Sequence, residues 1–236
     1  MSTHIPWKNP PILEVIFEIR FQPIADYAIF VGGMAANNAI HNQFPIIEKL
    51  PGSDFPPFAP IEGVVRHKFL TSEKTDIFQT GQDVISVNSL NYLGFENFLN
   101  QIRLVINTAN EFIDFAKFTK RIALRYINKF ENHNDHNDIF SALTIRNPFD
   151  DFDSIKTTEI FLRRVKEEEN LFLTTNIQYP VVIDDIQNNL VLDIEAFSIS
   201  SSLSELEILD WCNNSHEIIS RNFQNFVSDK ERSLRE

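Results

Sequence analysis

The feature that most constrains this fold is an alternation of apolar and polar side chains near the start of the chain. The odd positions from 13 to 21 are all apolar, whereas Glu14, Glu18 and Arg20 occupy the other side. This period of two is typical of a β-strand that buries one face and exposes the other. Antiparallel sheets commonly expose one face in this way. A second alternating segment begins at Ile122 and ends at Phe130, which predicts another strand of the same kind.

Each of these strands opens the same predicted order of elements: a strand, a crossover, three strands and a helical region. The first half predicts a helix near 27–35, a proline-rich extended connection, strands near 63–70, 75–80 and 83–88, and a helix over 95–116. The second half predicts a polar crossover from 131 to about 157, then strands over 159–166, 171–179 and 190–197. Two capping boxes, Ser204 with Glu207 and Asn214 with Glu217, predict a short helix followed by a separate last helix.

This order predicts an α+β fold in which an antiparallel sheet carries long helices on one face. Helix-grip and saddle-shaped folds arrange their elements similarly, so they serve as an architectural analogy. We expect a single domain over 1–236, with two halves at about 10–119 and 120–236, because no linker separates two independent cores.

Composition limits the cellular setting. The chain is 43% hydrophobic and has 22 phenylalanines, which is ample for a packed core. Its one cysteine, Cys212, excludes an intrachain disulfide framework and suits a reducing compartment. No apolar run reaches the roughly 18 residues that span a bilayer, and the first residues lack the pattern of a signal peptide. The sequence therefore predicts a cytoplasmic protein without a membrane association.

The distribution of charge leaves two interpretations open. A net charge of −12 argues against a surface that binds nucleic acid as a whole. Several cations nevertheless fall on predicted strands and are candidate ligand-binding residues: Arg66, Lys68, Arg125 and Arg164. One interpretation is a basic sheet face that binds a nucleotide or nucleic acid. The other is ordinary cross-strand pairing with Glu14, Glu18, Asp193 and Glu195.

Four short blocks resemble one protein family. They are Pro10–Val15, Leu124–Phe130, Leu192–Phe197, and His216-Glu217 followed by Phe223. The chain is similar in these blocks to a sporadically distributed, largely uncharacterised family of prokaryotic proteins of about this length. The family has no assigned catalytic residues, so the resemblance implies none here. Its patchy distribution implies mobile gene neighbourhoods, such as antiviral defence or toxin–antitoxin cassettes.

The mid-chain block has a physical interpretation of its own. Tyr126 shares the apolar side of the strand with Leu124, and a buried tyrosine hydroxyl usually finds a hydrogen-bond partner. Asn128 lies on the same side, whereas Arg125 lies on the other. The two side chains Tyr126 and Asn128 would then form a satisfied buried network. Alternatively, Arg125 and Asn128 contact a ligand.

Residues with catalytic or metal-binding chemistry are few. His133 and His136 have the right ligand types, but a polar tract without helical pattern surrounds them. Cys212 and His216 would need a continuous helix and a third orienting group to act together. The paired acids Asp193 and Glu195 lack the lysine of the common metal-dependent nuclease pattern, and no phosphate-binding glycine motif occurs. We therefore predict no catalytic residues, no metal site and no cofactor.

The sequence favours a non-catalytic interaction or sensor subunit with a protein partner, which could be a second copy of the chain. Phe55 and Phe58, among the prolines of the long connection, are candidate docking residues. A nucleotide-binding or nucleic-acid-binding module is the alternative, and a metal-dependent nuclease is a weaker one.

Overall fold

The computed structural model describes residues 9–51, 62–131, 142–144, 159–168, 171–184, 186–199 and 202–233. Within these ranges an open antiparallel sheet of nine strands has the order β2-β3-β4-β5-β1-β6-β9-β8-β7. The strands are β1 (Ile12–Phe21), β2 (Ile46–Lys49), β3 (Val65–Leu70), β4 (Asp76–Gly81), β5 (Val84–Ser89), β6 (Thr119–Phe130), β7 (Ile160–Glu168), β8 (Leu171–Ile183) and β9 (Ile186–Ile199). The helices are α1 (Tyr27–Ala36), α2 (Asn38–Gln43), α3 (Phe95–Ala109), α4 (Phe115–Phe118), α6 (Glu205–Phe226) and α7 (Asp229–Ser233).

The two alternating segments of the sequence form the middle of the sheet. β1 pairs antiparallel with β6, and in this register Phe17 lies opposite Leu124 while Ile19 lies opposite Ile122. All four of these side chains are fully buried. The predicted inward face of β1 is therefore confirmed, except at its start, where a register shift between Ile12 and Glu14 leaves Leu13 half-buried.

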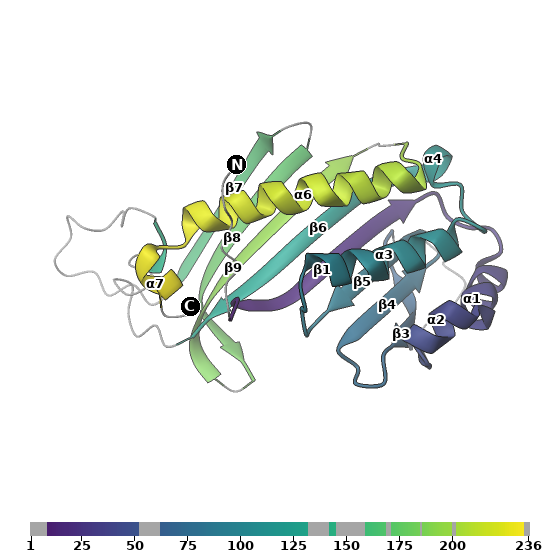
Figure 1. Cartoon of the computed structure of the whole chain (residues 1–236), viewed down its shortest axis with the longest axis horizontal. Coiled ribbons are helices and arrows are strands. Elements are labelled where there is room, and N and C mark those ends of the chain that lie inside the picture. Colours follow the sequence, from purple (N-terminus) through teal and green to yellow (C-terminus); the bar gives the residue numbers. More distant parts are fainter. Residues whose placement is uncertain are drawn as a thin grey trace.

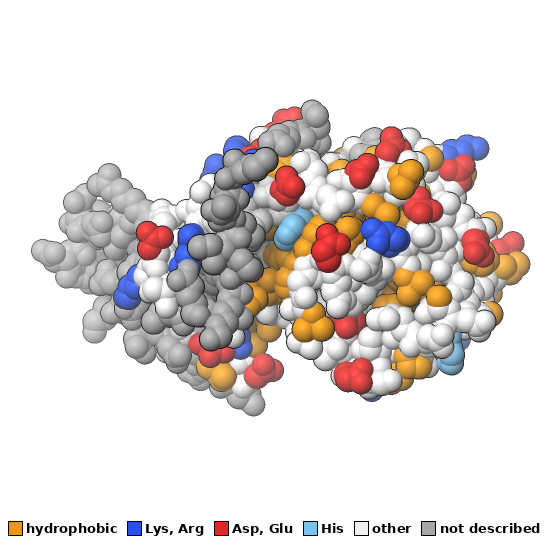
Figure 2. All heavy atoms as spheres, in the orientation of Figure 1, with side chains coloured by type: hydrophobic (Ala, Val, Ile, Leu, Met, Phe, Trp, Pro, Cys, Tyr) orange, Lys and Arg blue, Asp and Glu red, His pale blue; other side chains and the backbone are white. Residues whose placement is uncertain are grey.

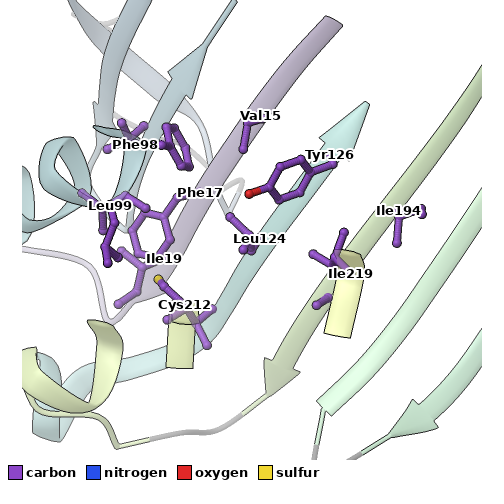
Figure 3. Packing of buried hydrophobic residues seen from close by; sticks show 14 of the residues in the cluster. Val15, Phe17, Ile19, Phe98, Leu99, Leu124, Tyr126, Ile194, Cys212 and Ile219 are labelled. Carbon is purple, nitrogen blue, oxygen red and sulfur yellow. The ribbon is translucent and has the colours of Figure 1, made fainter. Parts of the chain in front are cut away.

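The two long helices, α3 and α6, lie on one face of the sheet (Figure 1). They contact each other, and each also contacts strands of the sheet beneath it. Figure 3 shows side chains of β1 and β6 projecting into this layer, near Leu99 of α3 and Cys212 of α6. The core is the space between sheet and helices, as expected when an apolar helix stripe covers the apolar face of a sheet. None of the described helices is long and apolar enough to cross a membrane.

Two helix predictions need correction. The capping box of Ser204 with Glu207 is present and starts α6, but the predicted second cap at Asn214 is wrong because α6 continues without a break to Phe226. Buried residues of α6 lie on both sides of Asn213 and Asn214. The burial of this helix against the sheet outweighs the local preference of the two asparagines for a cap. The predicted helix over 95–116 is shorter than expected, because α3 ends at Ala109.

The proline-rich connection contains more regular structure than predicted. α2 and the short strand β2 both lie between α1 and residue 52, and the sequence pattern predicted neither of them. Among the described strands, β2 pairs only with β3, at the edge of the sheet. An edge position fits a strand that follows Pro45, because a proline cannot donate a hydrogen bond to a central ladder.

Candidate ligand pocket

A pocket of about 420 Å³ opens on the helical side of the sheet. Figure 2 shows hydrophobic side chains gathered around a hollow near the middle of this face, with a histidine beside them. The described residues that line it come from the start of β1, from β6, from the segment before α3 and from α6: Pro10, Pro11, Ile12, Tyr92, Leu93, Gly94, Phe95, Tyr126, Asn128, His216, Ile219, Ser220 and Phe223. A concave, mostly apolar pocket of this size is typical of small-molecule sites.

Strand and helix periodicity direct these side chains into the pocket. Tyr126 and Asn128 are two residues apart on β6, so both point to the helical side of the sheet. His216, Ile219 and Phe223 follow one another at spacings of three and four on α6, which places them on one side of the helix. Gly94 also lines the pocket and directly precedes α3. Its φ of 104° lies in the left-handed region that favours glycine, and this conformation allows the turn into α3.

A chain of hydrogen bonds crosses the floor of the pocket. The Tyr126 hydroxyl lies 2.8 Å from Nδ1 of His216 and 3.3 Å from the Tyr92 hydroxyl. The His216 ring also stacks on Phe95, with ring centroids 3.9 Å apart and planes at 6°. These hydrogen bonds therefore join the segment before α3 to β6 and α6, and together with the stacking they fix the orientation of the histidine ring.

Burial keeps the hydroxyls of Tyr92 and Tyr126 protonated. It raises the pKa of Tyr92 to about 12, although the hydrogen bond to Tyr126 acts in the opposite direction. Burial also raises the pKa of Tyr126 well above its ordinary value, and the neighbouring Tyr92 adds to the effect. The pKa of the Cys212 thiol is raised by complete burial, so this thiol is a small core group rather than a nucleophile.

The raised pKa of Tyr92 makes stability depend on alkaline pH. An unfolded tyrosine ionises near pH 10, whereas folded Tyr92 holds its proton to about 12. Between these values the folded state binds more protons than the unfolded state, so its stability is full below about pH 10 and falls as the pH rises. We expect Tyr92→Phe to show a smaller loss of melting temperature across this interval than the wild-type protein. Titration of tyrosinate absorbance provides the second measurement, in which the wild-type protein should have one more late-ionising tyrosine than the variant; identical titrations would contradict the assignment.

Asn128 is held by the backbone and not by Tyr126's hydroxyl. Its side-chain Nδ2 donates to the carbonyl oxygens of Leu192, at 3.1 Å, and Tyr126, at 3.4 Å. The predicted burial of Tyr126 and Asn128 is confirmed, since they are 5% and 2% exposed. The predicted direct network between the two side chains is wrong, because the hydroxyl reaches Tyr92 and His216 on other elements.

On the opposite face of the sheet, the candidate ligand residue Arg125 and its neighbour Arg121 form ion pairs. Arg125 donates from Nε and Nη2 to the two carboxylate oxygens of Asp193, at 2.7 and 2.8 Å. Arg121 bridges Glu18 and Glu195, at 2.9 and 2.8 Å. The predicted cross-strand pairing is therefore present for these cations, and Asp193 with Glu195 neutralises arginines on the neighbouring strand.

The structure does not bring the predicted ligand residues together. Arg66 donates to Oε1 of Gln82 and lies over the Tyr27 ring at 5.8 Å. Lys68 lies on β3 in the first half, whereas Arg164 is exposed on β7 at the far edge of the sheet. Of the five residues predicted to contact a ligand, Asn128 alone lines the pocket described above.

Two predicted features lie outside the described residues. Phe55 and Phe58, the candidate docking residues, fall in the range 52–61, and His133 and His136 fall in 132–141. Across the described ranges, no group of three or more histidine, cysteine, aspartate or glutamate side chains is arranged to hold a metal ion.

Sequence analysis missed three pocket residues for different reasons. Tyr92 follows a strand in a short connection and has no periodic neighbours, so no signal identified it. Phe95 was assigned to the apolar stripe of a helix, without a role. His216 was placed at a helix start, whereas in a continuous helix it lies three residues before Ile219, on the edge of the apolar stripe.

No family model matches this chain, and no curated protein matches it either. The resemblance in the four sequence blocks therefore stays a prediction. The case for a function rests on the geometry of the pocket.

Proposed function

We propose that this protein is a non-catalytic sensor subunit that binds an uncharged small molecule in the pocket between β6, the start of α3 and α6. The observation that carries this proposal is the composition of the pocket. Its walls are apolar and aromatic, and its floor holds a few fixed polar groups: Tyr92, Tyr126, Asn128 and His216. An apolar body with a few convergent polar groups is the usual pattern of a specific ligand site.

The architecture supports a sensor. β1 pairs with β5, the strand that precedes α3, and β6 pairs with β9, the strand that precedes α6. Each opening strand, β1 or β6, thus pairs with the strand that precedes a long helix. We infer from this order a saddle-like or helix-grip arrangement built from two halves. The pocket lies where elements of both halves meet, because α3 follows the first meander and α6 follows the second. A ligand there would contact both halves and could change how they pack.

A sensor acts through a partner. We propose a cytoplasmic setting and a protein partner that responds to occupancy of the pocket, either another copy of this chain or a different protein. The resemblance to a sporadically distributed prokaryotic family supports an antiviral defence or toxin–antitoxin setting. The nucleic-acid alternative requires cations that are not already neutralised, and the pairs of Arg121 and Arg125 with carboxylates favour the sensor instead.

The test uses N-phenyl-1-naphthylamine, an uncharged dye whose fluorescence rises in apolar surroundings. We expect saturable binding to the wild-type protein and at least about tenfold weaker binding to Ser220→Trp, whose indole would occupy part of the pocket. Leu206→Trp is the matched control, because Leu206 lies on the same helix but is 73% exposed and away from the pocket. Equal dye affinity in both variants would show that the dye binds elsewhere, and the proposal would lose its support.

A further inference from the structure

We infer that the pocket selects aromatic ligands that carry a hydrogen-bond donor, an O–H or an N–H group, and that Oδ1 of Asn128 accepts this hydrogen. This inference rests on the proposed function and names the chemical class of the ligand. It follows from three features of the pocket: the fixed orientation of Asn128, the aromatic rings of its walls, and the absence of charge among the described lining residues.

The Asn128 amide has only one orientation that suits its surroundings. Its Nδ2 faces two backbone carbonyl oxygens, those of Tyr126 and Leu192, and a carbonyl oxygen can only accept. A rotated amide would place Oδ1 against these oxygens. The backbone of β6 and β9 therefore fixes Nδ2 as the donor toward the sheet and leaves Oδ1 as the acceptor of the side chain.

Oδ1 of Asn128 receives no hydrogen bond from any residue that the structure describes. The side chain is nevertheless 2% exposed, and what it lines is the pocket. Oδ1 is not among the buried polar atoms that lack a partner, so this acceptor is accessible in the pocket and a donor on a ligand can reach it. A hydrogen-bond donor on a ligand would therefore satisfy Oδ1 of Asn128.

The tyrosine–histidine chain is compatible with a ligand donor in one tautomer of His216. When Nδ1 of His216 accepts the hydrogen of Tyr126, the Tyr92 hydroxyl donates to the oxygen of Tyr126. Both hydroxyl hydrogens are then used within the chain. In this tautomer the two oxygens keep lone pairs that can accept from a ligand; in the other tautomer Nδ1–H donates to Tyr126, and the Tyr92 hydroxyl can donate instead.

The walls indicate an uncharged, flat ligand. No lysine, arginine, aspartate or glutamate is among the described residues that line the pocket, so a charged group would be buried without a counter-charge. The adjoining hollow of about 460 Å³ shares Phe95 and His216 and is also lined by Glu96 and Glu217, whose negative charges disfavour an anion beside the pocket. The rings of Tyr92, Phe95, Tyr126 and Phe223 supply aromatic surfaces. Aromatic alcohols and N–H heteroaromatics meet all of these conditions.

The experiment compares 2-naphthol with 2-methoxynaphthalene, which has the same ring system but no donor. Affinities are measured by calorimetry and by displacement of N-phenyl-1-naphthylamine. We expect the wild-type protein to bind 2-naphthol at least about tenfold more tightly, the ratio that one buried hydrogen bond provides. Asn128→Leu should bind the two compounds equally, because the accepting oxygen is removed while the volume is kept. If Asn128→Leu does not fold, Asn128→Val replaces it, since valine also lacks an accepting oxygen and a β-branched residue suits a strand.

The outcomes separate this inference from the function on which it rests. Equal affinity of the wild-type protein for the two compounds would overturn donor selection and leave the small-molecule site intact. A preference that persists in the Asn128 variant would overturn the role of Oδ1. Failure of both naphthalenes with retained binding of the dye, which itself carries an N–H group, would overturn the inference for O–H donors, and failure of the dye as well would overturn the proposed function itself.

Discussion

Phe17→Ala should lower the free energy of unfolding by about 3–5 kcal/mol, the usual cost of deleting a fully buried aromatic ring. Phe17 is 0% exposed in the central strand β1. It lies opposite Val87 of β5 and Leu124 of β6, and its ring projects toward α3 (Figure 3). Elements of both halves thus surround the ring, and none of them can collapse fully into the cavity that alanine would leave.

Chemical denaturation with urea measures this effect through the midpoint of unfolding. The matched control is Phe161→Ala on β7, because the Phe161 side chain is 65% exposed. We expect this control to stay within about 0.5 kcal/mol of the wild-type protein, as exposed positions usually do. Similar losses in the two variants would contradict the assignment of the inward face of β1.

Tyr126→Ala should destabilise the protein by about 3 kcal/mol or more, and it should also abolish dye binding. Tyr126 is 5% exposed and packs edge-on against Tyr92. Its hydroxyl forms hydrogen bonds with the Tyr92 hydroxyl and with Nδ1 of His216. Its ring forms part of the core and part of the pocket floor. Removal of the ring therefore affects folding and the ligand site together.

Tyr126→Phe separates these two effects, because it keeps the ring and removes the hydroxyl. Nδ1 of His216 then loses its partner at 2.8 Å, so we expect a smaller loss of about 1–3 kcal/mol. Dye binding should persist in this variant, since the apolar walls are unchanged. Thermal unfolding followed by circular dichroism compares the three proteins, and a loss in Tyr126→Phe as large as that in Tyr126→Ala would show that the ring contributes little.

The central strands could be predicted from sequence because their signal is local. Alternation of apolar and polar residues fixes which side chains of β1 and β6 face the core, whatever the strands pair with. The capping box at Ser204 is local for the same reason, since its partner Glu207 is three residues away. These features need no knowledge of the tertiary structure.

The predictions that failed depend on distant residues. Asn214 with Glu217 has the local pattern of a helix start, but burial of α6 on the sheet holds the helix continuous through that position. β2 forms because β3 offers it a partner, and the sequence of β2 alone is too short to indicate a strand. In both cases a contact far along the chain overrides the local preference.

The pocket residues also include some that the sequence could indicate and others that it could not. Asn128 was a candidate ligand residue from its parity on β6, and the structure places it in the pocket. Tyr92 and His216 are 34 and 90 residues from Tyr126 in the chain, yet both contact its hydroxyl. Sequence spacing gives no information on such distances, because they depend on the packing of α6 against β6.

The amino-acid sequence by itself determined the inward faces of the central strands, the apolar stripes of the long helices and the burial of Tyr126 and Asn128. Each of these follows from periodicity within a single element. The tertiary structure alone decided the strand order, the pairing of Arg125 with Asp193 and the assembly of the pocket. These require elements that are far apart in the chain to meet, and the free energy that selects their arrangement comes from packing and desolvation between elements rather than from any one of them.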